Sequence, residues 1–293
     1  MSSGSILTHK VVTTIALVLS IYGNIRYALG RAPIEKNPED DPFFRVGFTP
    51  FTANILVVLI YWGALHLLQV SFVVQYFFPE DQPTERAQSS TIGNILQGGQ
   101  PTRLQVADHV GWHFTVFNFL HFFWTLLFVN GHYIWSEIFV ILNFFNILTL
   151  YVSHKTYAIK PFANYTLIHM STAALPFSWL LYLLFWNGAV AVGRNGFVAR
   201  IIANIFVWDF LLVPTVLLIL YRDWAVGFSS AALQLALGLG QLFTKIFALQ
   251  WIFAFIIAGL LFAFSLAVMS ADLRDSKKST TSTDAENAPL INN

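Results

Sequence analysis

Long apolar runs alternate with short polar segments along most of the chain. Eight of these runs approach or exceed the roughly 20 residues that a helix needs to cross about 30 Å of hydrocarbon. Their approximate bounds are 11–29, 51–78, 110–129, 133–153, 164–187, 198–221, 224–243 and 247–269. This pattern predicts an all-α fold, a polytopic transmembrane helical bundle of about eight spans within residues 1–270. Only "QLFTKIF" separates the last two runs, which we interpret as a tight hairpin, with one long bent helix as the alternative.

The polar segments define the ends and connections of this bundle. Residues 30–47 and 79–105 are rich in Pro, Gly, Gln and charge, so we expect solvated connectors there. Residues 271–293 are polar and rich in Ser and Thr, which predicts a disordered tail. An even number of spans places both termini on one side, where nine of the Lys and Arg residues fall, against seven on the other side. This asymmetry favours cytosolic termini.

The tail contains a possible sorting signal. In "ENAPLI", Glu286 stands four positions before Leu290 and Ile291. The pattern is typical of acidic dileucine signals, which cytosolic adaptor complexes bind, although six residues of tail can also match by accident. It favours the endomembrane system, the vacuolar or endosomal membrane above all, with the endoplasmic reticulum and the plasma membrane as alternatives.

Composition narrows the chemistry. Of the 293 residues, 56% are hydrophobic and 11% are charged, whereas soluble domains carry about 25% charged residues. The net charge of +1 argues against a nucleic-acid partner. The absence of cysteine excludes disulfides, thiolate metal sites and a Cys nucleophile. Neither a nucleotide-binding loop nor an "HExxH" pattern occurs, and the sequence predicts no cofactor and no metal site.

One carboxylate, Asp209, stands inside an apolar run. It follows Arg200 by nine residues, which places it about 13 Å along a helix, near the middle of the bilayer. Its neighbours on a continuous helix, Ile205, Leu212 and Val213, supply no polar partner. Because intramembrane charge is costly, such a residue usually faces the bundle interior or a wet cavity. Asp209 is then either a proton-linked or cation-binding carboxylate, or a protonated acid that bonds a neighbouring helix.

A second group of polar residues lies in the third run. "HFTVFNFLHFFW" places His113, Phe117, His121 and Trp124 on one helix face, with Asn118 beside them. This face either lines a pocket or packs as ordinary core with neutral histidines.

The fifth run, "LIHMSTAALPFSWLLYLLFW", supplies a different chemistry. His169 and Thr172 are three residues apart and therefore neighbours on a helix, so a histidine-activated Thr nucleophile is conceivable. The sequence identifies no orienting acid or oxyanion donor, and Thr172 can simply bond a backbone carbonyl of its own helix. Pro176 interrupts the backbone hydrogen bonds of the same helix, which favours a pocket or a kink nearby.

Several fragments together resemble one known family. "FTP" at 48–50, followed by "LIYW", is similar to the second-helix region of the tryptophan-rich sensory proteins, the TspO and translocator-protein relatives. "FNFLHFFWTLLF" resembles their aromatic helix through Asn118 and Trp124, and later helices of the family are similar at Pro176 and Asn204. The order of these features agrees across about residues 15 to 240. The chain also resembles uncharacterised multi-pass proteins of fungi.

The resemblance implies an all-helical bundle that binds planar hydrophobic molecules such as porphyrins or sterols. The chain departs from the family in two respects. Its tryptophan near the "LIY" segment is displaced to Trp62, and its eight predicted spans exceed the five of compact members.

These observations lead to one main hypothesis and two alternatives. The main hypothesis is a multi-pass membrane protein that binds or transports a small hydrophobic or amphipathic molecule in a pocket among the third, fifth and sixth spans. The predicted ligand-binding residues are Asp209, His121, Trp124, His169, Trp208, Asn118 and Asn204. The first alternative is an intramembrane lipid hydrolase that uses Thr172 and His169. The second is a non-catalytic scaffold whose small-residue stripe, Ala232, Ala236 and Gly240, packs closely against a neighbour.

Overall fold

The helices of the protein follow the predicted apolar runs. The structure, a computed structural model, describes residues 3–29, 49–77, 103–159, 162–193, 197–244 and 249–286. In chain order the helical elements are α1 (Ser3–Leu29), α3 (Ile55–Val74), η2 (Gln75–Phe77), α5 (Arg103–Val129), α6 (Tyr133–His154), η3 (Thr156–Ala158), α7 (Phe162–Asn164), η4 (Tyr165–Ala174), α8 (Leu175–Val192), α9 (Phe197–Phe206), α10 (Asp209–Tyr221), α11 (Trp224–Thr244) and α12 (Gln250–Glu286). The all-α prediction is confirmed, and within these ranges eight helices are long and apolar enough to cross a membrane.

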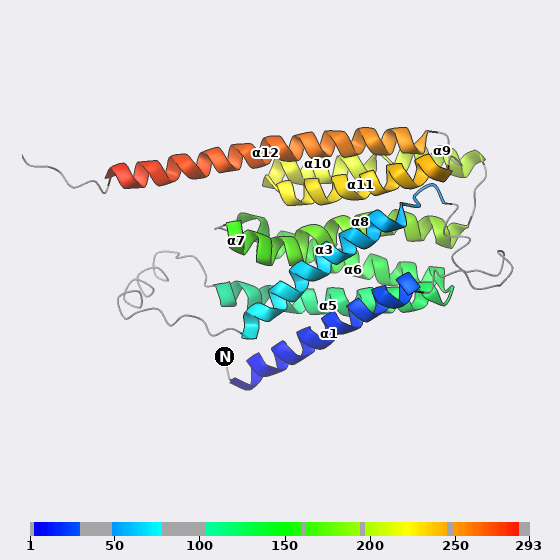
Figure 1. Cartoon of the computed structure of the whole chain (residues 1–293). Helices are drawn as coiled ribbons and strands as arrows, with labels where there is room; N and C mark the ends of the chain where they lie inside the picture. The colour runs from blue at the N-terminus through cyan, green and yellow to red at the C-terminus, as the bar shows by residue number, and fades with distance from the viewer. Residues whose placement is uncertain are drawn as a thin grey trace, which may run out of the picture.

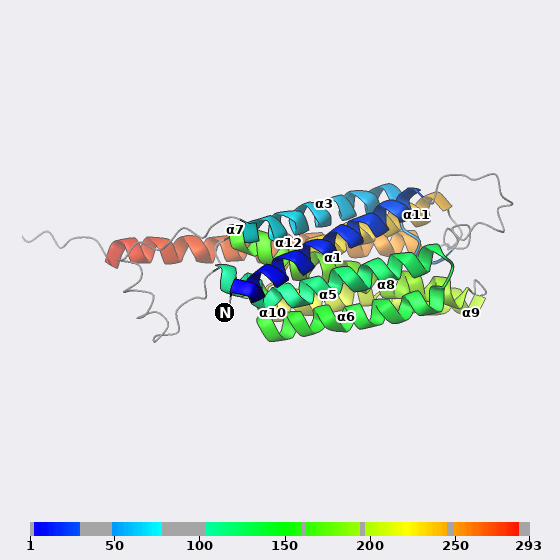
Figure 2. The ribbon, with the colours of Figure 1, turned by 90° about the horizontal axis from the view of Figure 1, so that it is seen from below.

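The long helices run roughly parallel to one axis (Figure 1). One side of the bundle consists of α10, α11 and α12, and the other of α1, α5 and α6. Between them lie α3 and the continuous helix of α7, η4 and α8, which contact both sides (Figures 1 and 2). The start of α1 and the end of α12 are at the same end of the bundle, which we call the termini end.

A non-helical segment, residues 49–54, precedes the second span and packs on α11. The backbone N–H of Asn54 donates to the carbonyl of Ala236 at 2.8 Å, although the two residues are far apart in sequence. The Gln241 amide donates to the carbonyls of Thr49 and Thr52 at 3.1 and 2.9 Å. These bonds satisfy backbone groups that a buried, non-helical segment would otherwise leave unpaired.

This close approach depends on the small residues of α11. A Cβ atom placed on Gly240 would lie 2.6 Å from the carbonyl oxygen of Thr52 and from the carbonyl carbon of Ala53. The small-residue stripe predicted from the sequence therefore meets a neighbour at Gly240 and Ala236, and that neighbour is the segment 49–54.

The fifth span contains a π-helix, η4, ten residues long. The Leu175 N–H that ends it bonds the carbonyl of Met170, five residues back. Pro176 follows and has no N–H to donate. Two hydroxyls bond the carbonyls of the widened turn: Ser171 donates to Ile168 at 3.1 Å, and Thr172 donates to the same carbonyl at 2.6 Å. Because π-helices are rare and usually a single turn long, this segment is an unusual feature of the fold.

The sixth span differs from the continuous helix assumed in the sequence interpretation. Val207 and Trp208 form a turn between α9 and α10, with i→i−3 hydrogen bonds from Trp208 to Ile205 at 3.2 Å and from Phe210 to Val207 at 3.3 Å. Asp209 is the first residue of α10. A carboxylate is favoured there because the helix dipole is positive at its N-terminus. Of the helical neighbours expected for Asp209, Leu212 and Val213 are in α10 with it, whereas Ile205 lies in α9 on the other side of the turn.

The C-terminal segment also differs from expectation. Helix α12 continues to Glu286, whereas the sequence predicts disorder from residue 271. Neither proline nor glycine occurs in residues 260–286, so nothing in the backbone ends the helix at the membrane boundary. Of the predicted sorting signal, Glu286 ends α12, and Leu290 and Ile291 lie outside the described residues.

Candidate functional site

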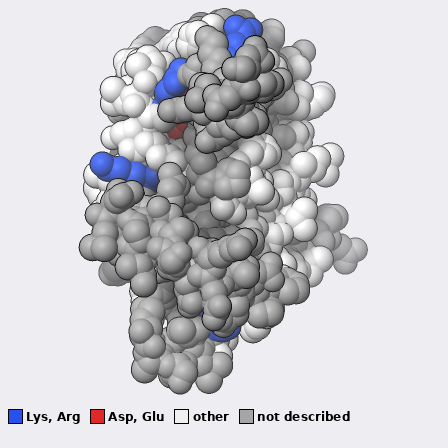
Figure 3. All heavy atoms as spheres, turned by 90° about the vertical axis from the view of Figure 1, so that its left-hand side faces the viewer, with Lys and Arg blue, Asp and Glu red and all other residues white. Residues whose placement is uncertain are grey.

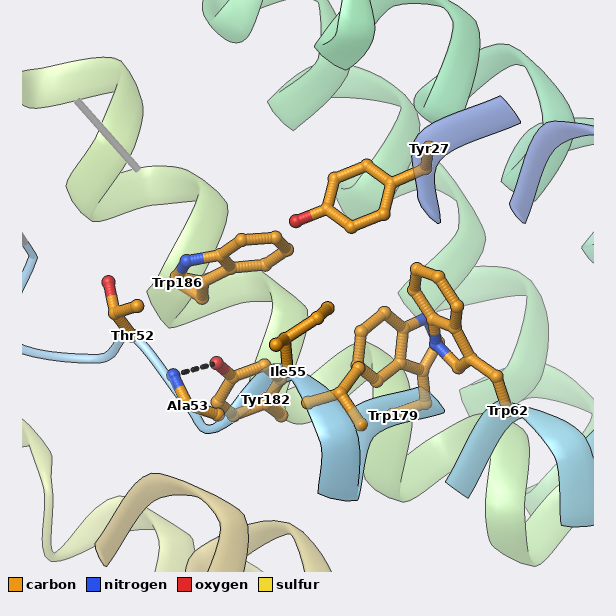
Figure 4. Close-up of a pocket in the computed structure, with 9 residues that line it drawn as sticks. Tyr27, Thr52, Ala53, Ile55, Trp62, Trp179, Tyr182 and Trp186 are labelled. Carbon is orange, nitrogen blue, oxygen red and sulfur yellow. Dashed lines mark hydrogen bonds between the residues drawn. The ribbon is translucent and has the colours of Figure 1, made fainter. Parts of the chain in front are cut away.

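An aromatic cavity lies between α1, α3 and α8, toward the end of the bundle opposite the termini end (Figure 4). Its aromatic wall consists of Tyr27 from α1, Trp62 from α3, and Trp179, Tyr182 and Trp186 from α8. Residues 52–58 supply backbone and aliphatic surface. We call this space the aromatic cavity.

Three indole N–H groups in this wall have no acceptor. The Nε1 atoms of Trp62, Trp179 and Trp186 are buried and make no hydrogen bond. The rings of Trp62 and Trp179 meet edge to face with centroids 5.2 Å apart, as Figure 4 shows. A buried donor without a partner costs about 1–3 kcal/mol. An acceptor bound in the cavity would offset part of this cost.

The backbone that closes the cavity is fixed by one tyrosine of α8. The hydroxyl of Tyr182 donates to the carbonyl of Phe51 at 2.7 Å and accepts the N–H of Ala53 at 3.1 Å (dashed in Figure 4). About 10 Å³ of the cavity admits the centre of a water molecule, which is room for roughly one water. In the conformation described, the cavity is closed around a space of that size.

A polar network reaches the outside of the cavity wall from α1, α3 and α5. His121 Nε2 lies 2.9 Å from the Asn24 oxygen, the Asn24 nitrogen lies 2.6 Å from His66 Nε2, and His66 Nδ1 lies 3.1 Å from the Gln69 oxygen. Because the Asn24 amide nitrogen can only donate, His66 accepts at Nε2 and donates from Nδ1. His121 then donates from Nε2, and its Nδ1 is a buried acceptor without a partner.

His121 connects this network to the tryptophans. Its ring centroid lies 5.1 Å from that of Trp124 and 6.3 Å from those of Trp62 and Trp179. The structure thus places His121 directly behind the cavity wall rather than in it.

Trp124 is held by a separate set of hydrogen bonds. Its Nε1 donates to the Asn187 oxygen at 3.0 Å, which also accepts the Ser136 hydroxyl at 2.8 Å. The Asn187 nitrogen donates to Glu137 at 2.7 Å. Trp124 is therefore a satisfied core residue beside the cavity, in contrast to the three unpaired tryptophans.

Asn118 lies on α5, about one helical turn before His121. Its nitrogen donates to the carbonyl of Phe114 at 3.0 Å, and its side-chain oxygen is buried without a partner. It does not line the aromatic cavity.

His169 belongs to a second site at the termini end of the bundle. Its Nε2 lies 2.8 Å from the carboxylate of Asp223, and its Nδ1 lies 2.8 Å from the Thr156 hydroxyl. Tyr165 donates to Asp223 at 2.9 Å, and Tyr151 also donates to it. We call these five residues the His169–Asp223 cluster, and both members of the ion pair have fully buried side chains.

Asp223 is also the residue that begins α11. Its carboxylate accepts the backbone N–H groups of Ala225 and Val226 at 3.1 and 3.2 Å, which is the geometry of a helix N-cap. Burial alone would raise the pKa of Asp223, but the charge and hydrogen bond of His169, with the two tyrosine hydroxyls, hold that pKa below its usual value.

The sequence interpretation missed Asp223 because it treated residues 222–223 only as a loop between two spans. An aspartate directly before an apolar run is a helix-start signal, and that signal identifies Asp223 as a cap. It does not identify His169 as the partner, since the two are 54 residues apart.

Thr172 and His169 do not form the dyad that a hydrolase would need. The Thr172 hydroxyl donates to the carbonyl of Ile168, and both His169 ring nitrogens bond other residues, Thr156 and Asp223.

The remaining predicted residues lie together elsewhere, beside α12. The Asn204 oxygen accepts the Gln250 amide at 3.0 Å, and the Trp208 ring packs on Phe253 with centroids 5.4 Å apart. Asp209 is half-buried, and within the described residues it forms no hydrogen bond or ion pair. The predicted ligand residues therefore fall at three separate places.

The described residues hold no group of three or more His, Cys, Asp or Glu side chains that could bind a metal ion.

Comparisons with known proteins match parts of the chain. Residues 200–291 match a family described as fungal protein of unknown function (DUF1774). The chain is 36% identical over 117 residues to the uncharacterized protein C637.03 of Schizosaccharomyces pombe. That match covers 40% of this chain and 42% of the relative, so the chain spans less than half of the relative's length. No solved structure matches.

These similarities agree with the expected likeness to uncharacterised fungal proteins. They give no support to the resemblance to tryptophan-rich sensory proteins, which stays a prediction. The family match covers α10, α11 and α12, and so includes Asp223 but none of the three unpaired tryptophans.

Proposed function

We propose that this multi-pass membrane protein binds a small amphipathic molecule in the aromatic cavity. The ligand would present a hydrogen-bond acceptor to the indole N–H groups and an apolar body to the aromatic rings. The observation that carries the proposal is the set of three buried, unpaired indole donors, Trp62, Trp179 and Trp186, around one cavity. Small-molecule sites are mostly apolar with a few placed polar groups, and this wall has that composition.

The size of the cavity restricts the ligand and its route. Room for one water does not accommodate a porphyrin or a sterol, so binding requires the wall to open. The Tyr182 hydrogen bonds to residues 51 and 53 are the contacts that hold it closed. Transport would further require that the cavity open toward both sides of the membrane in turn.

The two predicted residues nearest the cavity support its wall in this proposal. His121 and Trp124 pack against the unpaired tryptophans and hold them in place. Asp209 does not line the aromatic cavity, so this proposal assigns it no role in binding the ligand.

Substitution of the donors tests the proposal. Trp62→Phe and Trp179→Phe each remove an N–H and keep an aromatic ring. In purified, detergent-solubilised protein, we expect oleic acid, ergosterol or protoporphyrin IX to quench tryptophan fluorescence saturably. Each variant should then weaken that binding by about 2- to 13-fold, which corresponds to one hydrogen bond of about 0.5–1.5 kcal/mol.

Trp251→Phe is the matched control, because Trp251 is in α12 and does not line the cavity. It should leave the affinity unchanged. If none of the three probes binds, or if the cavity variants bind as tightly as the wild type, the aromatic cavity is not the ligand site.

The orientation and location of the protein are part of the proposal. Among the residues whose side chains are described, Lys10, Lys155, Arg222 and Arg274 lie toward the termini end by their positions in the helices, against Arg26 and Arg200 toward the other. Figure 3 shows Lys and Arg side chains on the face at the termini end. This asymmetry supports cytosolic termini. A cytosolic tail would expose the predicted dileucine signal to adaptor complexes, in a vacuolar or endosomal membrane.

A further inference from the structure

A groove on the outside of the bundle lies between α10 and α12, close to the termini end. Leu218 and Ile219 of α10 and Phe264, Ala267 and Val268 of α12 form its apolar lining, and its volume is about 350 Å³. Both helices belong to predicted membrane spans, and the Ile219 side chain is 72% exposed. We call this space the α10–α12 groove. If these helices span the membrane, a groove on their outer surface lies next to the hydrocarbon of the bilayer.

The groove has polar groups at both of its ends. Thr215 lines one end, and its hydroxyl is buried without a hydrogen-bond partner. Arg222, the C-cap residue directly after α10, lines the other end. The two residues are seven positions apart, which is about 10 Å along a helix, or roughly two thirds of a leaflet of about 15 Å.

Arg222 sits where a lipid phosphate would lie. Its side chain is 56% exposed and forms an ion pair of 3.4 Å with Asp272, whose side chain is 27% exposed. Such exposed pairs contribute about 0–1 kcal/mol, so the pair with Asp272 itself adds little stability. Arg222 also has a left-handed backbone (φ 54°), which directs the chain away from α10 at this point.

We propose that the α10–α12 groove binds an anionic phospholipid, with one acyl chain along the apolar lining and the phosphate on Arg222. The acyl chain fits because the lining is aliphatic and aromatic and opens sideways to the bilayer. The anionic headgroup fits because Lys155, the C-cap of α6, and Arg274, at the end of the last span, are further cations at the same end of the molecule. Basic sites between helices at the cytosolic surface are typical places for anionic headgroups. The site is separate from the aromatic cavity and does not depend on the proposed ligand there.

Native mass spectrometry of the full chain in a neutral detergent tests this proposal. Dioleoyl-phosphatidylserine and dioleoyl-phosphatidylcholine are titrated separately, and bound lipids are counted. We expect the wild type to bind the serine lipid more tightly. Arg222→Gln should reduce that preference by roughly 5-fold, the effect of one cation at about 1 kcal/mol. Arg26→Gln, in the last turn of α1 at the other end of the bundle, should change it by less than about 2-fold, since salt screens exposed charges that are more than about 10 Å apart.

A second variant separates the groove from the headgroup site. Ala267→Phe fills the apolar lining and should abolish the tight phosphatidylserine complex while the thermal unfolding midpoint stays near that of the wild type. Glycerophosphoserine, which carries the headgroup without acyl chains, should not compete.

Four outcomes of the experiments with the two lipids and the variants would overturn the proposal. They are equal binding of the two lipids by the wild type, an unchanged preference in Arg222→Gln, tight binding retained in Ala267→Phe, and a dimer that Ala267→Phe dissociates. The last outcome would assign the groove to a second copy of the chain. Competition by glycerophosphoserine would instead assign Arg222 to a free phosphate ester.

Discussion

The His169–Asp223 cluster allows one stability prediction to be worked out quantitatively. In the variant Asp223→Asn the side chain keeps its size, but the carboxylate becomes a neutral amide. The Asp223 carboxylate accepts three side-chain hydrogen bonds, from His169, Tyr151 and Tyr165. An amide nitrogen cannot accept a hydrogen bond, so with the amide oxygen on the Oδ1 side, where it keeps the bonds of Tyr165 and the helix cap, the bonds of His169 and Tyr151 to Oδ2 are lost. A hydrogen bond to a charged group contributes about 1.5–3 kcal/mol, which sets the loss from two such bonds. At the lower value, the total loss is about 3 kcal/mol.

Thermal unfolding of the purified protein in detergent measures this loss. At about 2 °C per kcal/mol for a large domain, Asp223→Asn should lower the unfolding midpoint by roughly 6 °C near neutral pH. Asp209→Asn is the matched control, because Asp209 is half-buried and has no partner among the described residues. That variant should unfold within about 1 °C of the wild type, as expected for a substitution worth less than about 0.5 kcal/mol.

The pH dependence provides an independent test of the same cluster. The pKa of Asp223 is lower in the folded protein than in the unfolded chain, where it is about 3.9. Its stabilising contribution is therefore complete above about pH 4 and is lost as the pH falls through the folded pKa. The difference between wild type and Asp223→Asn should shrink in that acid range. Equal midpoints at neutral pH, or a difference that does not change with acid, would refute this account of the cluster.

Two further predictions concern packing and location. Gly240→Ala places a Cβ against the backbone of residues 52–53 and should destabilise the protein by about 1–3 kcal/mol, while Gly259→Ala, which meets nothing within 4 Å, should be neutral or stabilising; equal unfolding midpoints would contradict the close packing. Replacement of both Leu290 and Ile291 by Ala should move an N-terminally tagged protein from the vacuolar or endosomal membrane to the plasma membrane in fluorescence microscopy, and an unchanged location would argue against a sorting signal.

The spans were predictable because each depends on a local property, namely about 20 apolar residues in a row. The irregular elements were not predictable in this way. The turn at Val207 and Trp208 has no glycine or proline in it, because the proline of this run, Pro214, lies further along in α10. The π-helix differs from an α-helix in which carbonyl each N–H bonds. Neither difference changes the apolar pattern, so hydropathy alone does not reveal them.

In the candidate sites, too, the residue types could be read from the sequence, whereas their partners could not. The sequence shows that Trp62 and Trp179 are tryptophans, but it does not show whether their N–H groups have a partner. That depends on whether α1, α3 and α8 bring a hydrogen-bond acceptor beside them. Trp124, which looks equivalent in the sequence, has a partner in Asn187, 63 residues away. His169 was identified as a candidate, whereas its partner Asp223 depends on a contact between the fifth span and the start of the seventh.

The π-helix has a consequence for the spacing between the two polar sites. His169 lies within η4, and Trp179 and Trp186 follow on the same continuous helix, in α8. Each residue of a regular α-helix turns the chain by about 100°. Deletion of one residue from η4, which would let the widened turn tighten toward α-helical geometry, would rotate Trp179 and Trp186 by about that angle relative to His169. The number of residues in η4 thus fixes the rotation of α8 about its axis relative to His169. It determines which face of α8 points into the aromatic cavity while His169 stays bonded to Asp223.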